Sequence, residues 1–588
     1  MDFEVEIKEL IAKSTLLKKD EIVIEKPKEG NFGDYAFPCF LLSREMKKNP
    51  VQIAKELAPK MKLPKEIEKV QAIGPYLNFY INKKYLLSKI INAVLKNKER
   101  YGSQLQGKGK TSLIEHTSLN PNSSPHMGRV RNAITGDIIT RILKFQGYKT
   151  ETHFFVNDTS KQIALMLLDF KGKETFGDLL SLYVKMNEKL KEDPELEKKV
   201  FEILEKTEHE DKKTTSKLKK LMKIATEGQR DILKKIGIEF DYFDFESKYV
   251  KEKVLHSIVE KLKHKAHVFE DADGRLVLDQ SGTEYHFEDK MKKSVLVLTR
   301  GSDAGKTYLY VVRDIAYHID KASRKKDLNI LVLGEDHKLY YQQLCAALEL
   351  LKIPCPRVIH YSFTLIKEED KVKKMATRKG DVVLLSELLE KLKNKAKEEI
   401  KSRAREKQVN LEKVSDAIAI GAIRYSIAKV ELDKNVIFDL EEALNIAGNS
   451  APYLQYSYVR ASNILSKVKK FNKDEIEIDT KKTKKKSSEI LFDSINEREI
   501  KSFDIKEFSL AKDLANFQEI ITKSTRDLKP HYLCNYAYNL AKNFNDFYEN
   551  CDVLKSEEKK QRILLVMAFK QVMENCLTIL GIPIIEEM

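Results

Sequence analysis

The segment TSLIEHTSLNPNSSPHMGRVRNAITGDIITRI, residues 111–142, sets our expectation of the fold. Its first five residues form an apolar run with the length of a buried strand, and the polar residues that follow are typical of a loop. From Met127 onward apolar side chains recur at helical spacing, beginning with Val130 and Ile134. A strand, a loop and a helix start in this order predict the ligand-binding edge of a parallel sheet.

Further short apolar runs alternate with helical stretches along the next two hundred residues. These runs are ETHFFVN, SVLVLT, YLYVV and NILVLG, which end at residues 157, 299, 312 and 334. Strands that alternate with helices predict an α/β fold, here a Rossmann-like doubly wound parallel sheet over residues 109–384. A Lys- and Glu-rich helical pattern at about 183–235 predicts a helical insertion in that domain.

Two regions with a different pattern of apolar residues flank the α/β region. Residues 1–108 combine helical periodicity with the strand-like YLNFYI, which predicts a small N-terminal α+β domain. After residue 384 the apolar spacing is helical throughout, which predicts a connecting region at 385–440 and an all-helical domain at 441–588. The charge block DTKKTKKKSSE at 479–489 repels itself and predicts a disordered loop, either a solvated connection or an arm that contacts nucleic acid.

Composition narrows the class of protein. The 588 residues carry 106 Lys and Arg against 90 Asp and Glu, a formal net charge of +16, which favours polyanionic partners such as nucleic acid. The six cysteines lie far apart without a C-x-x-C pair, so neither a disulfide framework nor a zinc site is indicated. The N-terminus is acidic and amphipathic, and no run of 18 apolar residues occurs, so we expect a cytoplasmic protein with no membrane partner.

GSDAGKT at 301–307 looks like a phosphate-binding P-loop, but its pattern does not fit. A P-loop has four residues between its glycines and opens a helix, whereas three residues separate Gly301 from Gly305 and a strand-like run follows. We therefore reject this motif as a nucleotide site.

The helix start after the first strand is a better candidate for a nucleotide site. Backbone N–H groups and the positive end of the helix dipole favour an anion there. The imidazole of His126 can donate to a phosphate oxygen, and Gly128 lets a nucleotide approach the backbone. An ordinary N-terminal helix residue is the alternative for His126, because a lone H-x-G pattern is weak.

This loop resembles the first signature of class I aminoacyl-tRNA synthetases, in the form found in arginyl-tRNA synthetases. Other segments resemble motifs of that family in the same order along essentially the whole chain. These segments are GDYAF at 33–37, VNDTSKQI at 156–163, RDIAYHI at 313–319, GEDHKLYYQQL at 334–344, GNSAPYLQYSYVR at 448–460 and the C-terminal RILLVMAFKQVMENCLTILGIPIIEEM.

The second class I signature resembles KMATRKG at 374–380, whose mobile cations would stabilise charge that develops on the α-phosphate of ATP. Both signatures depart from the family pattern: Arg129 stands where a second histidine is usual, and Ala376 and Thr377 replace serine and lysine. The resemblance implies the catalytic residues His126, Gly128, Arg129, Lys374, Arg378 and Lys379. It implies ATP-binding residues Pro125, His126, Gly128, Asp336, His337, Gln342 and Met375.

The segment YVVRDIAY is predicted to be a strand, Tyr308 to Val312, that runs into a helix. A site selective for arginine needs acceptors opposite its planar fork of N–H donors, and Asp314 and Tyr310 can supply them. By resemblance these two residues bind the arginine side chain. Glu115, Ser118 and Asn120 are implied to hold its α-amino and carboxylate end. The alternative for Asp314 is a helix N-cap acid, and Arg313 could form a structural ion pair.

The resemblance further implies ATP-dependent ligation of L-arginine to the terminal adenosine of tRNA(Arg) through an arginyl-adenylate. ATP would bring Mg²⁺, with no tightly bound metal or organic cofactor, tRNA would bind before activation, and residues 1–108 would touch the tRNA elbow. We expect a monomer. Tyr453, Tyr456 and Arg460 are candidates for tRNA contact, although tyrosines at helical spacing are more often core.

Two rival functions remain open at this point. A tRNA-independent nucleotidyltransferase would share the H-x-G loop but would not need some two hundred C-terminal helical residues. A catalytically idle tRNA-binding paralogue would account for Arg129, but it would not need His126, Gly128, Asp314 and Lys379 together.

Overall fold

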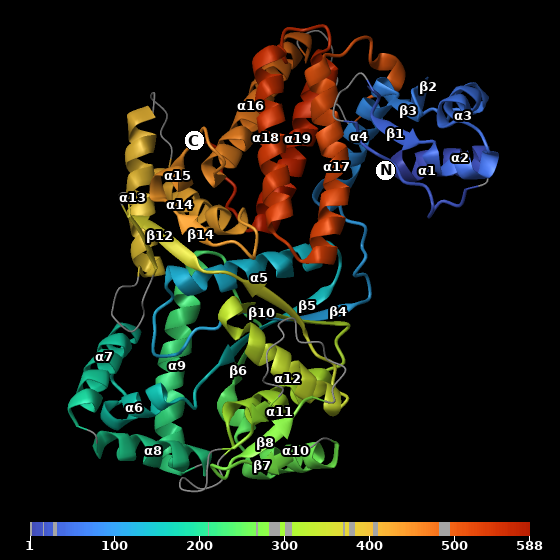
Figure 1. The fold of residues 1–588 in the computed structure, drawn as a ribbon. Helices are drawn as coiled ribbons and strands as arrows, with labels where there is room; N and C mark the ends of the chain where they lie inside the picture. The colour runs from blue at the N-terminus through green and yellow to red at the C-terminus, as the bar shows by residue number, and fades with distance from the viewer. Residues whose placement is uncertain are drawn as a thin grey trace. The chain divides into compact units, whose positions relative to one another are not determined.

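The computed structural model describes residues 3–15, 17–27, 32–193, 195–209, 211–265, 268–281, 295–299, 308–368, 371–374, 383–403, 410–480 and 494–587 (Figure 1). The chain forms two compact units. One unit contains residues 1–102, 457–519 and 539–575, and the other contains 103–456, 520–538 and 576–588. The C-terminal helices therefore contribute residues to both units.

The first unit begins with an antiparallel three-stranded sheet in the order β1-β3-β2. Its strands are β1 (Tyr35–Pro38), β2 (Ile67–Ile73) and β3 (Tyr76–Ile81), and its helices are α1 (Phe3–Ser14), α2 (Phe40–Met46), α3 (Pro50–Leu57) and α4 (Lys83–Asn97). Buried side chains from this sheet and from α1, α2 and α3 share one apolar cluster that includes Ile7, Ile53 and Phe79. The strand-like YLNFYI of the sequence is β3.

Four C-terminal helices complete the first unit and supply part of the second. They are α16 (Ala451–Thr480), α17 (Ile505–Asp527), α18 (His531–Asn550) and α19 (Lys559–Leu580). By length and composition alone α19 could cross a membrane, but most of its apolar stretch is buried inside the protein, as in a core helix. Stacking of the Phe544 and Phe569 rings, 3.7 Å between centroids, joins α18 to α19.

A five-stranded sheet organises the second unit, in the order β11-β10-β4-β5-β6, with every neighbouring pair parallel. Its strands are β4 (Thr111–Glu115), β5 (Lys149–Val156), β6 (Tyr242–Phe245), β10 (Leu328–Gly334) and β11 (Arg357–Tyr361). The helices α5 (Met127–Phe145), α11 (Tyr310–Ser323) and α12 (Lys338–Leu350) lie between strands in the chain. The α/β fold class predicted from alternating runs is confirmed.

Two apolar runs were wrongly predicted to be strands of this sheet. SVLVLT contributes β9 (Val295–Val297), which pairs antiparallel with β8 (Leu276–Asp279) and belongs to a separate sheet with β7 (Val268–Glu270). YLYVV is not a strand, because α11 begins at Tyr310 and continues through Asp314. A five-residue apolar run fits either structure, and here Val311, Val312 and Ile315 are buried on one face of the helix.

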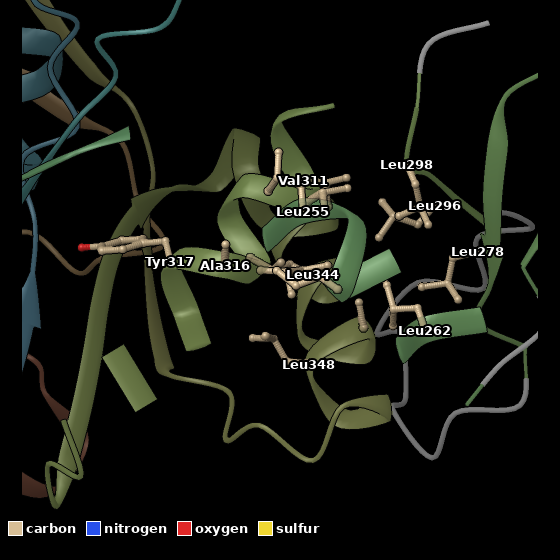
Figure 2. Close-up of a cluster of buried hydrophobic side chains, with 14 of the residues drawn as sticks. Leu255, Leu262, Leu278, Leu296, Leu298, Val311, Ala316, Tyr317, Leu344 and Leu348 are labelled. Atoms are coloured by element: carbon tan, nitrogen blue, oxygen red, sulfur yellow. The ribbon is translucent and has the colours of Figure 1, made fainter. Parts of the chain in front are cut away.

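An apolar cluster joins α11 and α12 to α10 (Glu252–Lys265) and to the β7-β8-β9 sheet. Figure 2 shows leucines of these elements meeting around Leu344, with Tyr317 at the edge of the cluster. This packing fixes the two helices that carry Asp314 and Tyr340. Its labelled members are Leu255, Leu262, Leu278, Leu296, Leu298, Val311, Ala316, Tyr317, Leu344 and Leu348.

Residues 161–235 are almost entirely helical, so the helical pattern predicted at 183–235 is part of a longer stretch (Figure 1). Its helices are α6 (Lys161–Asp169), α7 (Phe176–Glu192), α8 (Glu195–Glu208) and α9 (Lys212–Lys235). Beyond residue 384 the chain contains α13 (Leu385–Arg403), α14 (Leu411–Ala428) and α15 (Leu440–Leu444). The prediction of helices alone is wrong there, because β14 (Val436–Phe438) pairs with β12 (Thr364–Glu368).

Two sequence predictions fall wholly or mostly outside the described residues. The rejected P-loop at 301–307 lies outside them, and so does the charged loop from residue 481 to 489, while Asp479 and Thr480 end α16.

One prediction about the cysteines is wrong, because Cys345 and Cys355 form a disulfide. Cys345 lies in α12, which ends at Leu350, and Lys352 has a φ of +58° that turns the chain back. This turn brings the two Cα atoms to 5.3 Å, which spacing along the sequence could not indicate.

Candidate active site

The strand order creates a crevice at the carboxyl ends of β4 and β10. The chain passes from β4 to β5 on one side, and β10 lies on the other side of β4. Ligands of open parallel sheets bind at such a switch point. Asn132 of α5 bridges its two sides, because its Oδ1 accepts from the Thr117 backbone N–H at 2.7 Å and its Nδ2 donates to the Val332 carbonyl at 2.9 Å.

The loop after β4 ends at His126, which is the N-cap of the 19-residue helix α5. The His126 side chain is buried, and its Nδ1 has no hydrogen-bond partner among the described residues. Burial, helped by the nearby charge of Arg129, lowers the pKa of His126 to about 4. The ring is therefore neutral at pH 7 and can donate one hydrogen bond to an acceptor at the helix start.

The two arginines that follow this cap have different surroundings. Arg129 is half-buried near Tyr361 of β11: burial raises the pKa of Tyr361, and the charge of Arg129 opposes that rise. Arg131 is fully buried and donates to the carbonyls of Ser362, Glu431 and Lys434 at 2.7–2.8 Å. Arg131 is thus structural, which leaves Arg129 as the cation of the first turn that can reach a ligand.

The second signature begins at the end of a hairpin formed by β12 and β13 (Lys371–Lys374), where Lys374 is the last residue of β13. Met375, Arg378 and Lys379 lie outside the described residues. The chain then returns to the first signature. Leu385 N–H donates to the Pro125 carbonyl at 2.9 Å, and Met127 N–H donates to the Val383 carbonyl at 3.2 Å. The segment after the second signature is therefore held against the start of α5.

Asp336 and His337 follow β10 in a short 3-10 helix, Glu335–His337, which leads into α12. Their side chains are substantially exposed and lie 3.8 Å apart, measured from His337 Nε2 to Asp336 Oδ2. Gln342 is half-buried near the start of α12. All three residues thus follow the carboxyl end of a strand that borders the crevice.

A cluster of carboxylates includes Glu115, Glu246 and Asp314, and the charges of the first two act on the third. Glu115 is the last residue of β4, and its Oε2 forms an ion pair with the buried Lys321 Nζ at 2.6 Å. Asp314 is the fifth residue of α11 and accepts a hydrogen bond from the Tyr340 hydroxyl. Desolvation, together with the charges of Glu246 and Glu115, raises the pKa of Asp314 to about 7.

The Asp314 residue as a whole keeps some exposure to solvent, while its carboxyl group is strongly desolvated. Tyr310 begins the same helix and is 59% exposed, with its ring 5.2 Å from that of Tyr340. The structure therefore brings Tyr310, Asp314 and Tyr340 together. Ser118 is half-buried and Asn120 is exposed in the loop after β4.

Some charged side chains around this cluster of carboxylates have ion-pair partners and others do not. Arg313 Nη1 contacts Glu246 Oε1 at 3.5 Å, which is the structural ion pair that the sequence allowed, and also donates to the Thr159 hydroxyl at 3.2 Å. Lys321 pairs with Glu115. Among the residues that the structure describes, the carboxylate of Asp314 has no cation within ion-pair distance. Asp314 is therefore the carboxylate of this cluster that a positively charged group could still pair with.

The sequence did not predict three residues that contact or influence these carboxylates, namely Lys321, Tyr340 and Glu246. Lys321 could have been found, because it lies seven residues after Asp314 and so shares its helix face. Tyr340 lies within a motif that was quoted but was not assigned to the arginine site. Glu246 had no signal, because no pattern distinguishes it from other acids of the chain.

The candidate tRNA residues lie on α16. Tyr453 and Tyr456 are half-buried, and the Tyr453 ring lies 5.5 Å from that of Tyr538. Arg460 donates to Asn545 Oδ1 at 2.7 Å and lies over the Tyr548 ring at 4.6 Å. These residues keep part of their surface accessible. Within the described parts of the chain, no group of three or more His, Cys, Asp or Glu side chains is arranged to hold a metal ion.

Comparison with known proteins gives three family matches along the chain. They are "Arginyl tRNA synthetase N terminal domain" over residues 2–81, "tRNA synthetases class I (R), catalytic domain" over 90–440 and "DALR anticodon binding domain" over 454–588. The arginine–tRNA ligase of Methanocaldococcus jannaschii is 36% identical, over 98% of this chain and 97% of its own length. The corresponding ligase of Methanosphaera stadtmanae is 34% identical over the same shares.

Among solved structures, the arginyl-tRNA synthetase of Thermus thermophilus aligns with a TM-score of 0.77. The alignment covers 100% of each chain at 24% sequence identity, so this likeness concerns the fold.

Proposed function

The chain belongs to the arginyl-tRNA synthetase family, and from that premise we propose which residues perform each part of its reaction. The protein is an arginine–tRNA ligase that joins L-arginine to tRNA in an ATP-dependent step of protein synthesis. In the proposed course of the reaction, the carboxylate of arginine attacks the α-phosphorus of ATP and pyrophosphate leaves. The arginyl group then passes from arginyl-adenylate to the terminal adenosine of tRNA(Arg).

ATP is proposed to lie at the start of α5. His126, neutral at pH 7, would donate to a phosphate oxygen, and Gly128 would allow the nucleotide to approach the helix start. The cations Arg129, Lys374, Arg378 and Lys379 would stabilise charge on the phosphates during transfer. Pro125, Asp336, His337, Gln342 and Met375 would complete the nucleotide site. Mg²⁺ would arrive with ATP as part of the substrate.

Arginine is proposed to lie in the pocket of carboxylates. Its guanidinium would pair with Asp314 beside the Tyr310 hydroxyl, since a planar fork of donors matches a carboxylate. Glu115, Ser118 and Asn120 would hold the α-amino and carboxylate end. The observation that carries this proposal is the desolvated carboxyl of Asp314, which has no ion-pair partner within the described residues.

For tRNA, we propose that Tyr453, Tyr456 and Arg460 contribute to binding at the anticodon and that residues 1–108 touch the elbow. Residues 109–384 would form the catalytic domain, with an insertion at about 183–235. Residues 385–440 would connect it to the anticodon-binding domain at 441–588, and 479–489 would form a loop. We further propose a cytoplasmic monomer that has no membrane partner.

A comparison of arginine with citrulline tests the arginine pocket. Citrulline has nearly the same shape but is neutral, so an ionised Asp314 should favour arginine strongly. We would measure ATP–pyrophosphate exchange with each amino acid, with tRNA present. We expect the wild-type protein to use arginine alone and the Asp314→Asn variant to lose most of this preference. Asp320→Asn, on the same helix, is the matched control. An unchanged preference in Asp314→Asn would remove Asp314 from the pocket.

A further inference from the structure

The helix α9 reaches the loop that follows β4. Gln229 of α9 is fully buried, and its Nε2 donates two hydrogen bonds to this loop. One bond goes to the carbonyl of Asn120 at 2.9 Å, and the other goes to the carbonyl of Ser123 at 2.8 Å. A side chain from the helical stretch thus binds both ends of a four-residue turn in the candidate site.

Other contacts hold this turn less completely. The Ser123 N–H and hydroxyl both donate to the Asn120 carbonyl at 3.1 Å, which closes the turn on itself. On one side, however, residues 121–124 border a cavity of about 270 Å³ lined also by Phe176, Leu180 and Ile232. Close packing therefore does not fix the turn on that side, and the hydrogen bonds of Gln229 fix its position.

A glycine beside Gln229 lets α9 pack closely against α7. Gly228 precedes Gln229, and a Cβ atom at this position would lie 2.1 Å from the Phe176 ring at the start of α7. Any larger residue would push α9 away from α7. Gly228 therefore sets how closely α9 packs against α7 next to Gln229.

We infer that Gln229 is a positioning residue for arginine binding, which acts by fixing the backbone from which the Asn120 side chain extends. This inference rests on the proposed role of Asn120 in holding the α-amino and carboxylate end of arginine. The start of α5 is held separately, because Pro125 and Met127 are bonded to Leu385 and Val383. Loss of the Gln229 hydrogen bonds should therefore weaken the binding of arginine more than the binding of ATP.

The first test replaces Gln229 by methionine, which has a similar size but donates no hydrogen bond. The chain offers a matched control in Gln455, which is equally buried and whose Nε2 donates to the carbonyls of Ala417 and Pro583 at 3.2 and 2.8 Å. Gln455→Met loses the same kind of bonds far along the chain from the turn. Both variants should unfold at lower temperature than the wild type.

Only Gln229→Met should raise the KM for arginine, by about ten-fold, as expected when two hydrogen bonds that position a binding group are lost. Its KM for ATP should change by less than about two-fold, because the helix start keeps its own bonds. A lowered melting temperature with an unchanged KM for arginine would reduce Gln229 to a structural role and overturn the inference. If Gln229→Met does not fold, Gln229→Asn keeps a buried amide that is one methylene too short.

A double-mutant cycle separates this inference from the proposed function. If Gln229 acts through Asn120, Gln229→Met should have little further effect on arginine KM in an Asn120→Ala background. A normal KM for arginine in Asn120→Ala would refute the proposed role of Asn120. A raised KM in Asn120→Ala, with additive effects in the double variant, would instead refute the inference about Gln229 alone.

Discussion

Glu115 and Asp314 belong to the same cluster of carboxylates but differ in what balances their charge. Glu115 forms an ion pair with Lys321, whose side chain is fully buried. Asp314 accepts a hydrogen bond from the hydroxyl of Tyr340, and no cation pairs with Asp314 in the described part of the chain. Burial of an unpaired carboxylate is unfavourable, which is why the pKa of Asp314 is raised to about 7.

This difference separates a charge that the fold itself stabilises from a charge that, in our proposal, the guanidinium of arginine stabilises. An ion pair within the protein contributes to the folded state before any substrate binds. An uncompensated buried acid does the opposite: it is unfavourable in the free protein and becomes favourable when a cation enters. We therefore expect changes at Lys321 to affect stability first, and changes at Asp314 to affect arginine binding first.

The largest effect should follow from Asp314→Asn, which removes the charge but keeps the shape. The kcat/KM for arginine should fall about 10³-fold, because the guanidinium would be buried without its counter-ion. The free energy of unfolding of the unliganded protein should not fall above pH 7, since the variant no longer buries a charge. Steady-state kinetics and thermal melts test both parts, and a large loss of stability with normal arginine kinetics would reverse the comparison.

The second effect concerns stability. Lys321→Met would leave Glu115 buried without its partner and should lower the free energy of unfolding by about 3 kcal/mol. Lys326→Met is the matched control, because Lys326 pairs with Glu151 at a partly exposed position. This control substitution should lower the free energy of unfolding by less than about 1 kcal/mol. Urea unfolding measures both variants, and equal losses would mean that the Glu115–Lys321 pair is no more structural than a surface pair.

The sequence predicted the strands that border this site better than the helix that carries Asp314. The runs that became β4 and β10 are apolar and of strand length, and they border the crevice. The family resemblance named Glu115, Tyr310 and Asp314, and the fold brings them near enough for the charge of Glu115 to act on Asp314 and that of Asp314 to act on Tyr310. The start of α11 was misread as a strand, because a short apolar run does not distinguish a buried strand from a buried helix turn.

Contacts between residues far apart in the sequence could not be predicted from local pattern, even where, as for Lys321, the helix face could be. Lys321 lies 206 residues from Glu115, and Gln229 lies 109 residues from Asn120. Such contacts depend on how strands are ordered and how helices pack, which neither periodicity nor motif spacing specifies. The disulfide between Cys345 and Cys355 escaped for a related reason, because a turn in the backbone sets its geometry.

A smaller effect should appear as a dependence of arginine KM on pH. With a pKa of about 7, Asp314 is mostly protonated at pH 6 and mostly ionised at pH 8, so the KM should be about ten-fold higher at pH 6. Protein stability depends on pH in the opposite direction to arginine binding. Because the folded pKa is raised above 3.8, this group contributes stability that is fully present below pH 3.8 and is lost as the pH rises through about 7. The pH step in KM should be absent in Asp314→Asn.

The smallest effect should come from Tyr340→Phe, which removes the hydroxyl that donates to Asp314. Burial raises the pKa of Asp314, and this hydrogen bond holds it below the value that burial alone would give. The variant should therefore raise arginine KM about three-fold at pH 8 and move the midpoint of its pH dependence upward. Arginine kinetics between pH 6 and 9 would measure both changes. A midpoint that moves downward would show that Tyr340 favours the protonated acid, and the contrast between Glu115 and Asp314 would then need a different cause.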